Sequence, residues 1–212
     1  MIFGKSKSQL PDASDALPGR DARTHAVGDR HLVLGNPIET DPPEGFEAVV
    51  VGLGCFWGEE KTFWEVPGVW STSVGYAGGV TPNPSYEEVC TARTGHAEVV
   101  RIIFDPAEVS FQQILQVFWE NHDPTQGMRQ GNDRGSQYRS IILTTTPDQQ
   151  KLAEESRDHY QEKMTAAGYG QITTAIQPLE QYYYAEDYHQ QYLVKNPFGY
   201  CPLHATGIKY DA

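Results

Sequence analysis

The sequence predicts an α+β sandwich. Apolar or alternating runs typical of strands take turns with amphipathic runs typical of helices, and no Rossmann glycine fingerprint accompanies them. The length of 212 residues suits one main domain with a sizeable core. Residues 1–45 are rich in proline and show no sustained period, so we expect an extended N-terminal arm there.

Five segments have the composition of strands or extended chain. The first ends in a continuous apolar run, which is typical of a buried strand, and the second alternates between two sets of side chains. Asp105-Pro106 ends the third. The five segments are 46–53, 69–76, 97–104, 139–144 and 172–178.

Helices are predicted between these strands by their periodicity and end signals. Ser110 and Gln113 resemble a capping box, and Thr146-Pro147 places a proline in the first turn of the longest helix. A polar, glycine-rich loop is expected over 123–137, and such loops often carry function. The predicted helices are 55–64, 86–90, 111–121, 147–167 and 186–194.

The charge balance argues against several classes of partner. Lys and Arg number 16 against 28 Asp and Glu, which gives a net charge of -12. Without a basic run we expect no nucleic-acid partner, and the acidity would repel an anionic membrane surface. No apolar run is long enough to span a membrane, and no apolar core follows Lys5 and Lys7, so we expect neither an anchor nor a secretory signal.

The stretch around Cys55 is the first candidate for chemistry. An apolar strand, a glycine-containing turn and a helix place Cys55 at or just before the first helical turn. The free N–H groups and the positive end of the helix dipole favour an anion there, and the thiolate is the reactive form of cysteine. A small buried thiol is the alternative, but Phe56 and Trp57 suggest a pocket beside the sulfur.

The remaining cysteines and the histidines do not suggest a metal site. Three cysteines, at 55, 90 and 201, are too few and too scattered for a disulfide scaffold or a CxxC site, and they fit free thiols in a reducing cytosol. The histidines do not pair at i, i+4 with an acidic third ligand, and no HExxH motif occurs. They are His25, His31, His96, His122, His159, His189 and His204.

Five motifs, in the same order, resemble the peptide-methionine sulfoxide reductase A family, which acts on the S epimer of the sulfoxide. They are GCFWGE at 54–59, GHAE at 95–98, FWENHDP at 118–124, GNDRGSQYRS at 131–140 and YYAEDYHQQYL at 183–193. The resemblance covers 46–201 and implies a catalytic α+β domain there, followed by an irregular tail at 202–212. It also implies a two-layer sandwich with a ferredoxin-like core, a mixed sheet and long loop excursions.

The resemblance implies a set of site residues. Cys55 would be the nucleophile toward the sulfoxide sulfur, and Glu98 would donate the proton to the oxygen, because burial at a strand start raises a carboxyl pKa. Tyr86 and Tyr138 look like the phenols that bond the sulfoxide oxygen, and Asp133 looks like the pocket carboxylate. The residues expected to line the recess for the substrate methyl group are Phe56, Trp57 and, with a packing role as the alternative, Tyr200.

The resemblance also implies how the enzyme is recycled. Cys55 becomes a sulfenic acid, which Cys201 converts to a disulfide. Relatives often carry one more cysteine in the tail, but residues 203–210 here contain none, so a single Cys55–Cys201 disulfide should be reduced directly by thioredoxin, or by dithiothreitol in the test tube. Cys90 is expected to be a buried, non-catalytic thiol. No cofactor is implied, and we expect a cytoplasmic monomer acting on methionine S-sulfoxide, free or in oxidised proteins.

Two other functions fit the residues alone. Cys55 could be the acyl nucleophile of a cysteine hydrolase with a histidine as base, in which case an acyl adduct would form instead of a disulfide. Alternatively, Phe56 and Trp57 could form the aromatic platform of a peptide-binding module. Such a module would bind sulfoxide peptides without consuming them.

Overall fold

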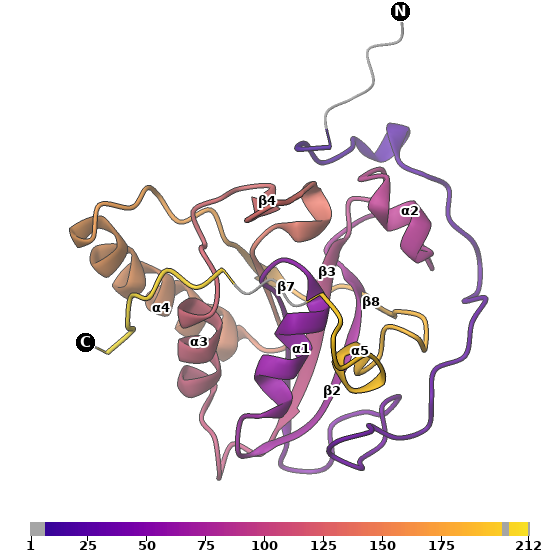
Figure 1. Ribbon diagram of the computed structural model, residues 1–212, viewed down its shortest axis with the longest axis horizontal. Coiled ribbons are helices and arrows are strands. Elements are labelled where there is room, and N and C mark those ends of the chain that lie inside the picture. The colour runs from indigo at the N-terminus through magenta and orange to yellow at the C-terminus, as the bar shows by residue number, and fades with distance from the viewer. Residues whose placement is uncertain (1–6, 201–203, 212) are drawn as a thin grey trace, which may run out of the picture.

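A mixed sheet of six strands forms the centre of the computed structural model, which describes residues 7–200 and 204–211 (Figure 1). Neighbouring strands are antiparallel except for the parallel pair of β6 and β7 at one edge. The α+β class and the mixed sheet are therefore confirmed. Across the sheet the order is β7 (Ala175–Pro178), β6 (Ile141–Thr144), β1 (Glu47–Gly52), β3 (Ala97–Phe104), β2 (Val69–Ala77) and β8 (Tyr182–Tyr184).

Strand β1 lies in the middle of the sheet, which explains its continuous apolar run. Val49 and Val51 contribute to the larger core, whereas Val50 belongs to a smaller cluster with Ile141 and Leu143. Successive side chains of a strand point to opposite faces of the sheet, so these valines lie on both faces. All three are fully buried. Both faces of the sheet are thus covered at β1.

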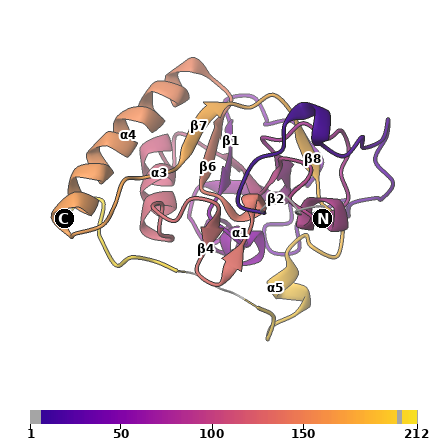
Figure 2. The ribbon, with the colours of Figure 1, turned by 90° about the horizontal axis from the view of Figure 1, so that it is seen from above.

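Most helical side chains of the larger core come from α1 (Phe56–Trp64), α3 (Phe111–Glu120) and α4 (Pro147–Ala166), and α2 (Tyr86–Cys90) adds Val89. Figures 1 and 2 show α3 and α4 side by side, with α1 next to α3. Helix α1 connects β1 to β2, and α3 leads from β3 toward β6. This connectivity and the central order β6-β1-β3-β2 are consistent with the ferredoxin-like core, which stays a prediction.

The helix-start signals predicted at Ser110 and at Thr146-Pro147 are confirmed. The Ser110 hydroxyl accepts the backbone N–H of Gln113, and the Gln113 side chain bonds back to Ser110, so the capping box is complete. Helix α2 (Tyr86–Cys90) has a second capping box, between Ser85 and Glu88. In α4 the cap is Thr146, followed by the expected proline.

The predicted helix over 186–194 is wrong for most of its length. Residues 187–191 form turns, and helix α5 covers only Tyr192–Lys195. The buried side chain of Gln190 explains the difference, because it bonds the N–H and C=O of Val74 and the C=O of Ala185. These bonds hold the segment against β2, and backbone N–H groups within it bond C=O groups only three residues back, as in turns.

The loop predicted over 123–137 contains structure of its own. Strands β4 (Arg129–Gln130) and β5 (Asp133–Arg134) form a hairpin, and a 3-10 turn follows at Ser136–Tyr138. Gly131 at the hairpin turn has a φ of 58°, a conformation that glycine adopts without strain. The hairpin and the turn present Asp133 and Tyr138 toward the start of α1.

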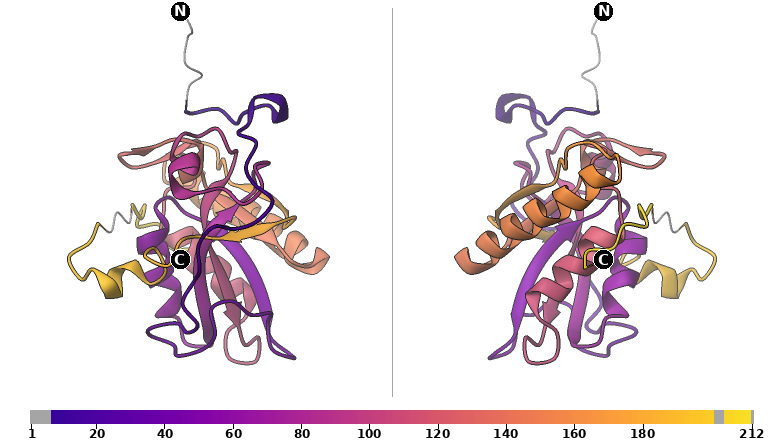
Figure 3. Two further views of the ribbon diagram at one scale, coloured as in Figure 1. Left: turned by 90° about the vertical axis from the view of Figure 1, so that its right-hand side faces the viewer. Right: turned by 90° about the vertical axis from the view of Figure 1, so that its left-hand side faces the viewer.

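The described part of the N-terminal arm follows the β8 side of the sheet (Figures 1 and 3). Arg20 forms an ion pair with Glu88 at 2.8 Å, and the His25 ring bonds the C=O of Tyr184 at 3.0 Å. Its one helical turn is the 3-10 segment Ala13–Asp15. Residues 204–211 pack on α3 and α4. There Lys209 forms an ion pair with Glu120 at 2.7 Å.

Candidate active site

The end of β1 presents Cys55 directly before the first turn of α1. Cys55 is the N-cap residue and is 8% exposed. The preceding Gly54 has a φ of 135°, and a Cβ there would lie 2.8 Å from the Cβ of Gln130 on β4. Only glycine therefore lets the hairpin β4–β5 pack this closely against the cysteine turn.

Glu59 fixes the same turn from inside the helix, a role that the sequence analysis did not assign. Its Oε1 accepts the backbone N–H of Leu53 at 2.7 Å, and the side chain is buried. Burial first, and then the charge of Glu98, raise the pKa of Glu59 well above its ordinary range. The signal in the sequence was its position one helical turn after Cys55.

Glu98, near the start of β3, is buried beside Cys55. Its Oε2 accepts the Phe56 N–H at 3.4 Å, and its Oε1 has no hydrogen-bond partner among the described residues. Burial, with a smaller contribution from the charge of Asp133, raises the pKa of Glu98 to about 8, although the bond from Phe56 opposes the shift. Glu98 is therefore protonated at neutral pH, as its place in the sequence predicted.

The expectation that the helix start favours a Cys55 thiolate is wrong for this site. Burial, followed by the charge of Glu98, raises the pKa of the Cys55 thiol. A bond from the Trp57 backbone opposes the shift but is outweighed. The isolated cysteine turn would favour the anion, whereas the complete site keeps the proton on sulfur.

Tyr86 and Tyr138 are brought to the same place from α2 and from the 3-10 turn. For both phenols burial is the largest cause that raises the pKa, and the charge of Glu98 is the next. Their hydroxyl groups thus stay protonated and can donate hydrogen bonds. Tyr86 lies near Cys90, whose thiol is only partly buried and not buried as expected.

Asp133 lies at the exposed side of this group. Its charge contributes to the raised pKa of Glu98, and burial raises its own pKa in turn. The Tyr200 hydroxyl, on a half-exposed side chain, approaches both Asp133 oxygens at 3.4 Å. Cys201, which follows Tyr200, lies outside the described residues.

Trp57 and Phe56 occupy different depths. Trp57 is partly buried, donates from its indole nitrogen to His189 Nδ1 at 2.9 Å, and stacks on Tyr192 with ring centroids 3.9 Å apart and planes inclined by 14°. Phe56 is fully buried in the larger core, with its ring centroid 6.4 Å from that of Trp57. Neither Tyr192 nor His189 was among the site residues expected from the sequence.

The described part of the chain offers neither a candidate metal-binding group nor a membrane-spanning helix. Residues 7–200 and 204–211 contain no group of three or more His, Cys, Asp or Glu side chains placed to hold a metal ion. Within the same residues, no helix has the length and apolar character needed to cross a bilayer.

A cysteine at a helix start, enclosed with a protonated carboxyl group and two phenols, defines a thiol-dependent enzyme. A family model described as peptide methionine sulfoxide reductase matches residues 47–211. The chain belongs to this family.

Individual relatives match between 78% and 98% of this chain. Peptide methionine sulfoxide reductase MsrA of Rhodospirillum centenum is 60% identical over 207 residues, covering 98% of this chain and 94% of that protein. Methionine sulfoxide reductase A of Corynebacterium diphtheriae superposes with a TM-score of 0.87 and 50% identity, covering 94% of this chain and 97% of that structure. For reduced Mxr1 of Saccharomyces cerevisiae the TM-score is 0.71 and the identity 33%, over 78% of this chain and 94% of that one.

Proposed function

We propose that this enzyme reduces methionine S-sulfoxide, free and in oxidised proteins, with Cys55 as its nucleophile. The observation that carries the assignment is the pair formed by the buried Cys55 thiol and Glu98, whose pKa is raised to about 8. A sulfoxide needs a soft nucleophile at sulfur and an acid at oxygen. This pair supplies both at neutral pH.

In the first step Glu98 donates its proton to the sulfoxide oxygen, which Tyr86 and Tyr138 also hydrogen-bond. The sulfur of Cys55 bonds to the activated sulfoxide sulfur, and the thiol proton passes to the Glu98 carboxylate. The S–O bond of the substrate and the transient bond between the two sulfurs then break, the electron pair of the latter stays on the methionine sulfur, and the hydroxyl oxygen bonds to the Cys55 sulfur. Sulfoxide and thiol become thioether and sulfenic acid, so atoms and electrons balance.

In the second step Cys201 displaces the oxygen of the Cys55 sulfenic acid. An S–S bond forms, the S–O bond breaks, and the hydroxyl leaves as water with the proton of the Cys201 thiol. A dithiol reductant then reduces the disulfide by thiol exchange. Thioredoxin is our proposed reductant, and yeast Mxr1, a relative of this chain, has been solved in complex with Trx2.

The substrate methyl group would lie against Trp57. Its partly buried indole is held on one side by Tyr192 and at its nitrogen by His189, while Phe56 supports it from the core. Aromatic faces pack well against a methyl group next to sulfur. We place Asp133 and Tyr200 at the outer edge of this recess. Action as a monomer in the cytoplasm, without nucleic-acid or membrane partners, stays a prediction. The division of the chain into an arm, a catalytic domain and a tail, with boundaries after residues 45 and 201, also stays a prediction.

The first experiment measures reduction of each methionine sulfoxide epimer separately, with dithiothreitol as reductant. We expect consumption of the S epimer alone and none of either epimer by Cys55→Ser, because the nucleophilic sulfur is lost. Consumption of both epimers at similar rates would contradict the stereochemical assignment. Activity in Cys55→Ser would contradict the choice of nucleophile.

A further inference from the structure

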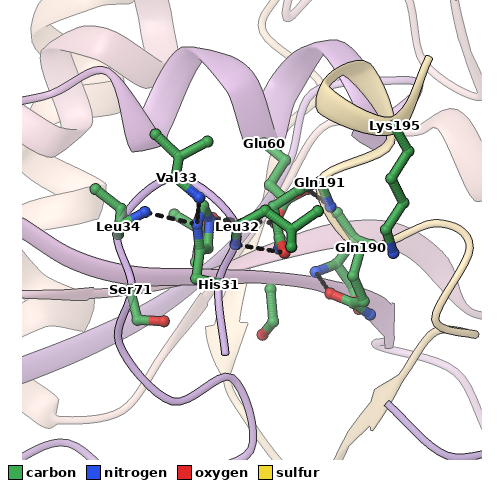
Figure 4. Close-up of polar contacts among 12 residues, drawn as sticks. His31, Leu32, Val33, Leu34, Glu60, Ser71, Gln190, Gln191 and Lys195 are labelled. Carbon is green, nitrogen blue, oxygen red and sulfur yellow. Dashed lines mark hydrogen bonds and ion pairs between the residues drawn. The ribbon is translucent and has the colours of Figure 1, made fainter. Parts of the chain in front are cut away.

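A buried polar chain joins the N-terminal arm to α1, away from the group around Cys55 (Figure 4). It consists of His31 in the arm, Thr72 on β2, Glu60 on α1 and Gln191 directly before α5, and each of the four is at most 1% exposed. We call these four residues the His31 relay. None of them has a role in the chemistry described above.

The hydrogen bonds of the His31 relay have a defined direction. His31 Nδ1 accepts the backbone N–H groups of Val33 and Leu34, both at 3.1 Å, and therefore carries no proton. The proton is on Nε2, which donates to the Thr72 hydroxyl at 2.8 Å. That hydroxyl then donates to Glu60 Oε1 at 3.0 Å.

At its other end the relay holds an unusual backbone conformation. Gln191 has a φ of 46° and a ψ of 45°, the left-handed region that a residue with a side chain rarely adopts. Its backbone N–H donates to Glu60 Oε2 and its side-chain amide to Glu60 Oε1, both at 2.7 Å. The carboxyl group of Glu60 thus offsets the backbone strain at Gln191.

This conformation determines where the next side chain goes. Gln191 directly precedes Tyr192, whose ring stacks on Trp57. Trp57 and Glu60 lie one turn apart on α1 and therefore share a helix face. Glu60 consequently ties the helix that carries Trp57 to the segment that carries its stacking partner.

We propose that the His31 relay positions Trp57, so that the N-terminal arm takes part in shaping the recess for the substrate methyl group. His31 and Glu60 are positioning residues in this scheme, since they act through Gln191 and Tyr192. The inference rests on the proposed function of Trp57. It gives the arm a role in substrate recognition.

The test removes single members of the relay and observes Trp57 directly. The indole N–H resonance of Trp57, one of four tryptophans, is assigned with Trp57→Phe and compared among His31→Ala, Thr72→Val and wild type. Thr72→Val is isosteric and removes only the hydroxyl. Thr72→Ser retains the hydroxyl, and Arg30→Ala changes an exposed neighbour in the same arm turn, so these two are the matched controls.

We expect His31→Ala and Thr72→Val to shift the Trp57 resonance. We also expect them to raise KM for the S-sulfoxide about ten-fold with kcat nearly unchanged, because a positioning bond for the binding recess is lost. Thr72→Ser and Arg30→Ala should keep the wild-type resonance and KM.

If Thr72→Val folds and keeps the wild-type Trp57 resonance or the wild-type KM, the proposal is overturned. If His31→Ala fails to fold, the result for Thr72→Val decides the test. A raised KM without a resonance shift would also overturn it, since the effect would not pass through Trp57. The resonance needs no turnover. Failure of wild type to reduce sulfoxide would therefore refute the proposed function while still leaving the relay tested.

Discussion

At the scale of single residues, burial decides the protonation of the site. Cys55 and Glu98 lie beside a helix start, where backbone N–H groups favour negative charge, yet the pKa of each is raised because desolvation is the larger effect. The motifs predicted which residues meet. The protonation state of Cys55 could not be predicted, because it depends on how deeply β1, β3 and the hairpin bury it.

Glu98→Gln tests whether Glu98 donates the proton to the sulfoxide oxygen. Without the proton donor we expect sulfoxide reduction to fall by about 10²–10⁴-fold. In wild type the rate of the first step should fall as the pH rises through about 8, where Glu98 loses its proton. Rapid-quench measurement of methionine formed in one turnover, over a range of pH, gives both results.

The same substitution should change stability with pH. The pKa of Glu98 is about 8 in the folded protein against an ordinary value of 4.5, so its contribution to stability is fully present below pH 4.5 and is lost as the pH rises through 8. Glu98→Gln should therefore gain in Tm relative to wild type between about pH 5 and about pH 9. A difference in Tm that does not vary with pH would contradict the raised pKa.

At the scale of elements, the strands and helices with strong local signals were predictable and those that depend on distant contacts were not. The apolar run of β1 and the capping box of α3 specify their elements locally. The turns before α5 depend on the bonds of Gln190 to β2, and β8 pairs with β2 at the edge of the sheet. No local pattern in the sequence contains those partners.

The packing of the β4–β5 hairpin on the cysteine turn predicts a sharp effect of Gly54→Ala. A Cβ at 2.8 Å from Gln130 and a φ of 135° should together lower stability by about 2–3 kcal/mol and reduce activity. Gly45→Ala is the matched control. Gly45 also has a positive φ, but nothing lies within 4 Å of its Cβ position, so we expect about 1 kcal/mol or less.

Chemical denaturation of Gly54→Ala and Gly45→Ala, followed by sulfoxide assays of the folded proteins, separates steric contact from backbone strain. Equal losses of stability in both variants would mean that the β4–β5 hairpin moves aside to make room for the added methyl group. The close approach of β4 to Gly54 would then not constrain the site.

At the scale of the whole molecule, the described parts of both terminal segments pack against the rest of the structure. The arm contributes His31 to a buried relay, and residues after 203 pack on α3 and α4. The sequence predicted an extended arm and an irregular tail. It could not predict their contacts, because neither segment has a periodic pattern that marks a buried face.

The C-terminal segment supplies the prediction for turnover. Cys201→Ser should form about one methionine per enzyme and then stop with thioredoxin as reductant, because no thiol condenses with the Cys55 sulfenic acid. Cys90→Ser should continue to turn over, since the Cys90 thiol takes no part in the proposed disulfide formation or its reduction. Multiple turnovers of Cys201→Ser with thioredoxin would show that another route recycles Cys55.

The protonated state of Cys55 at rest has a consequence for survival of the enzyme itself. Hydrogen peroxide oxidises thiolates far faster than thiols. A sulfur that keeps its proton is therefore shielded from the same oxidants that damage methionine in other proteins. Burial thus makes the Cys55 thiol unreactive toward most compounds. It keeps the thiol intact for a sulfoxide, whose oxygen Glu98 can protonate.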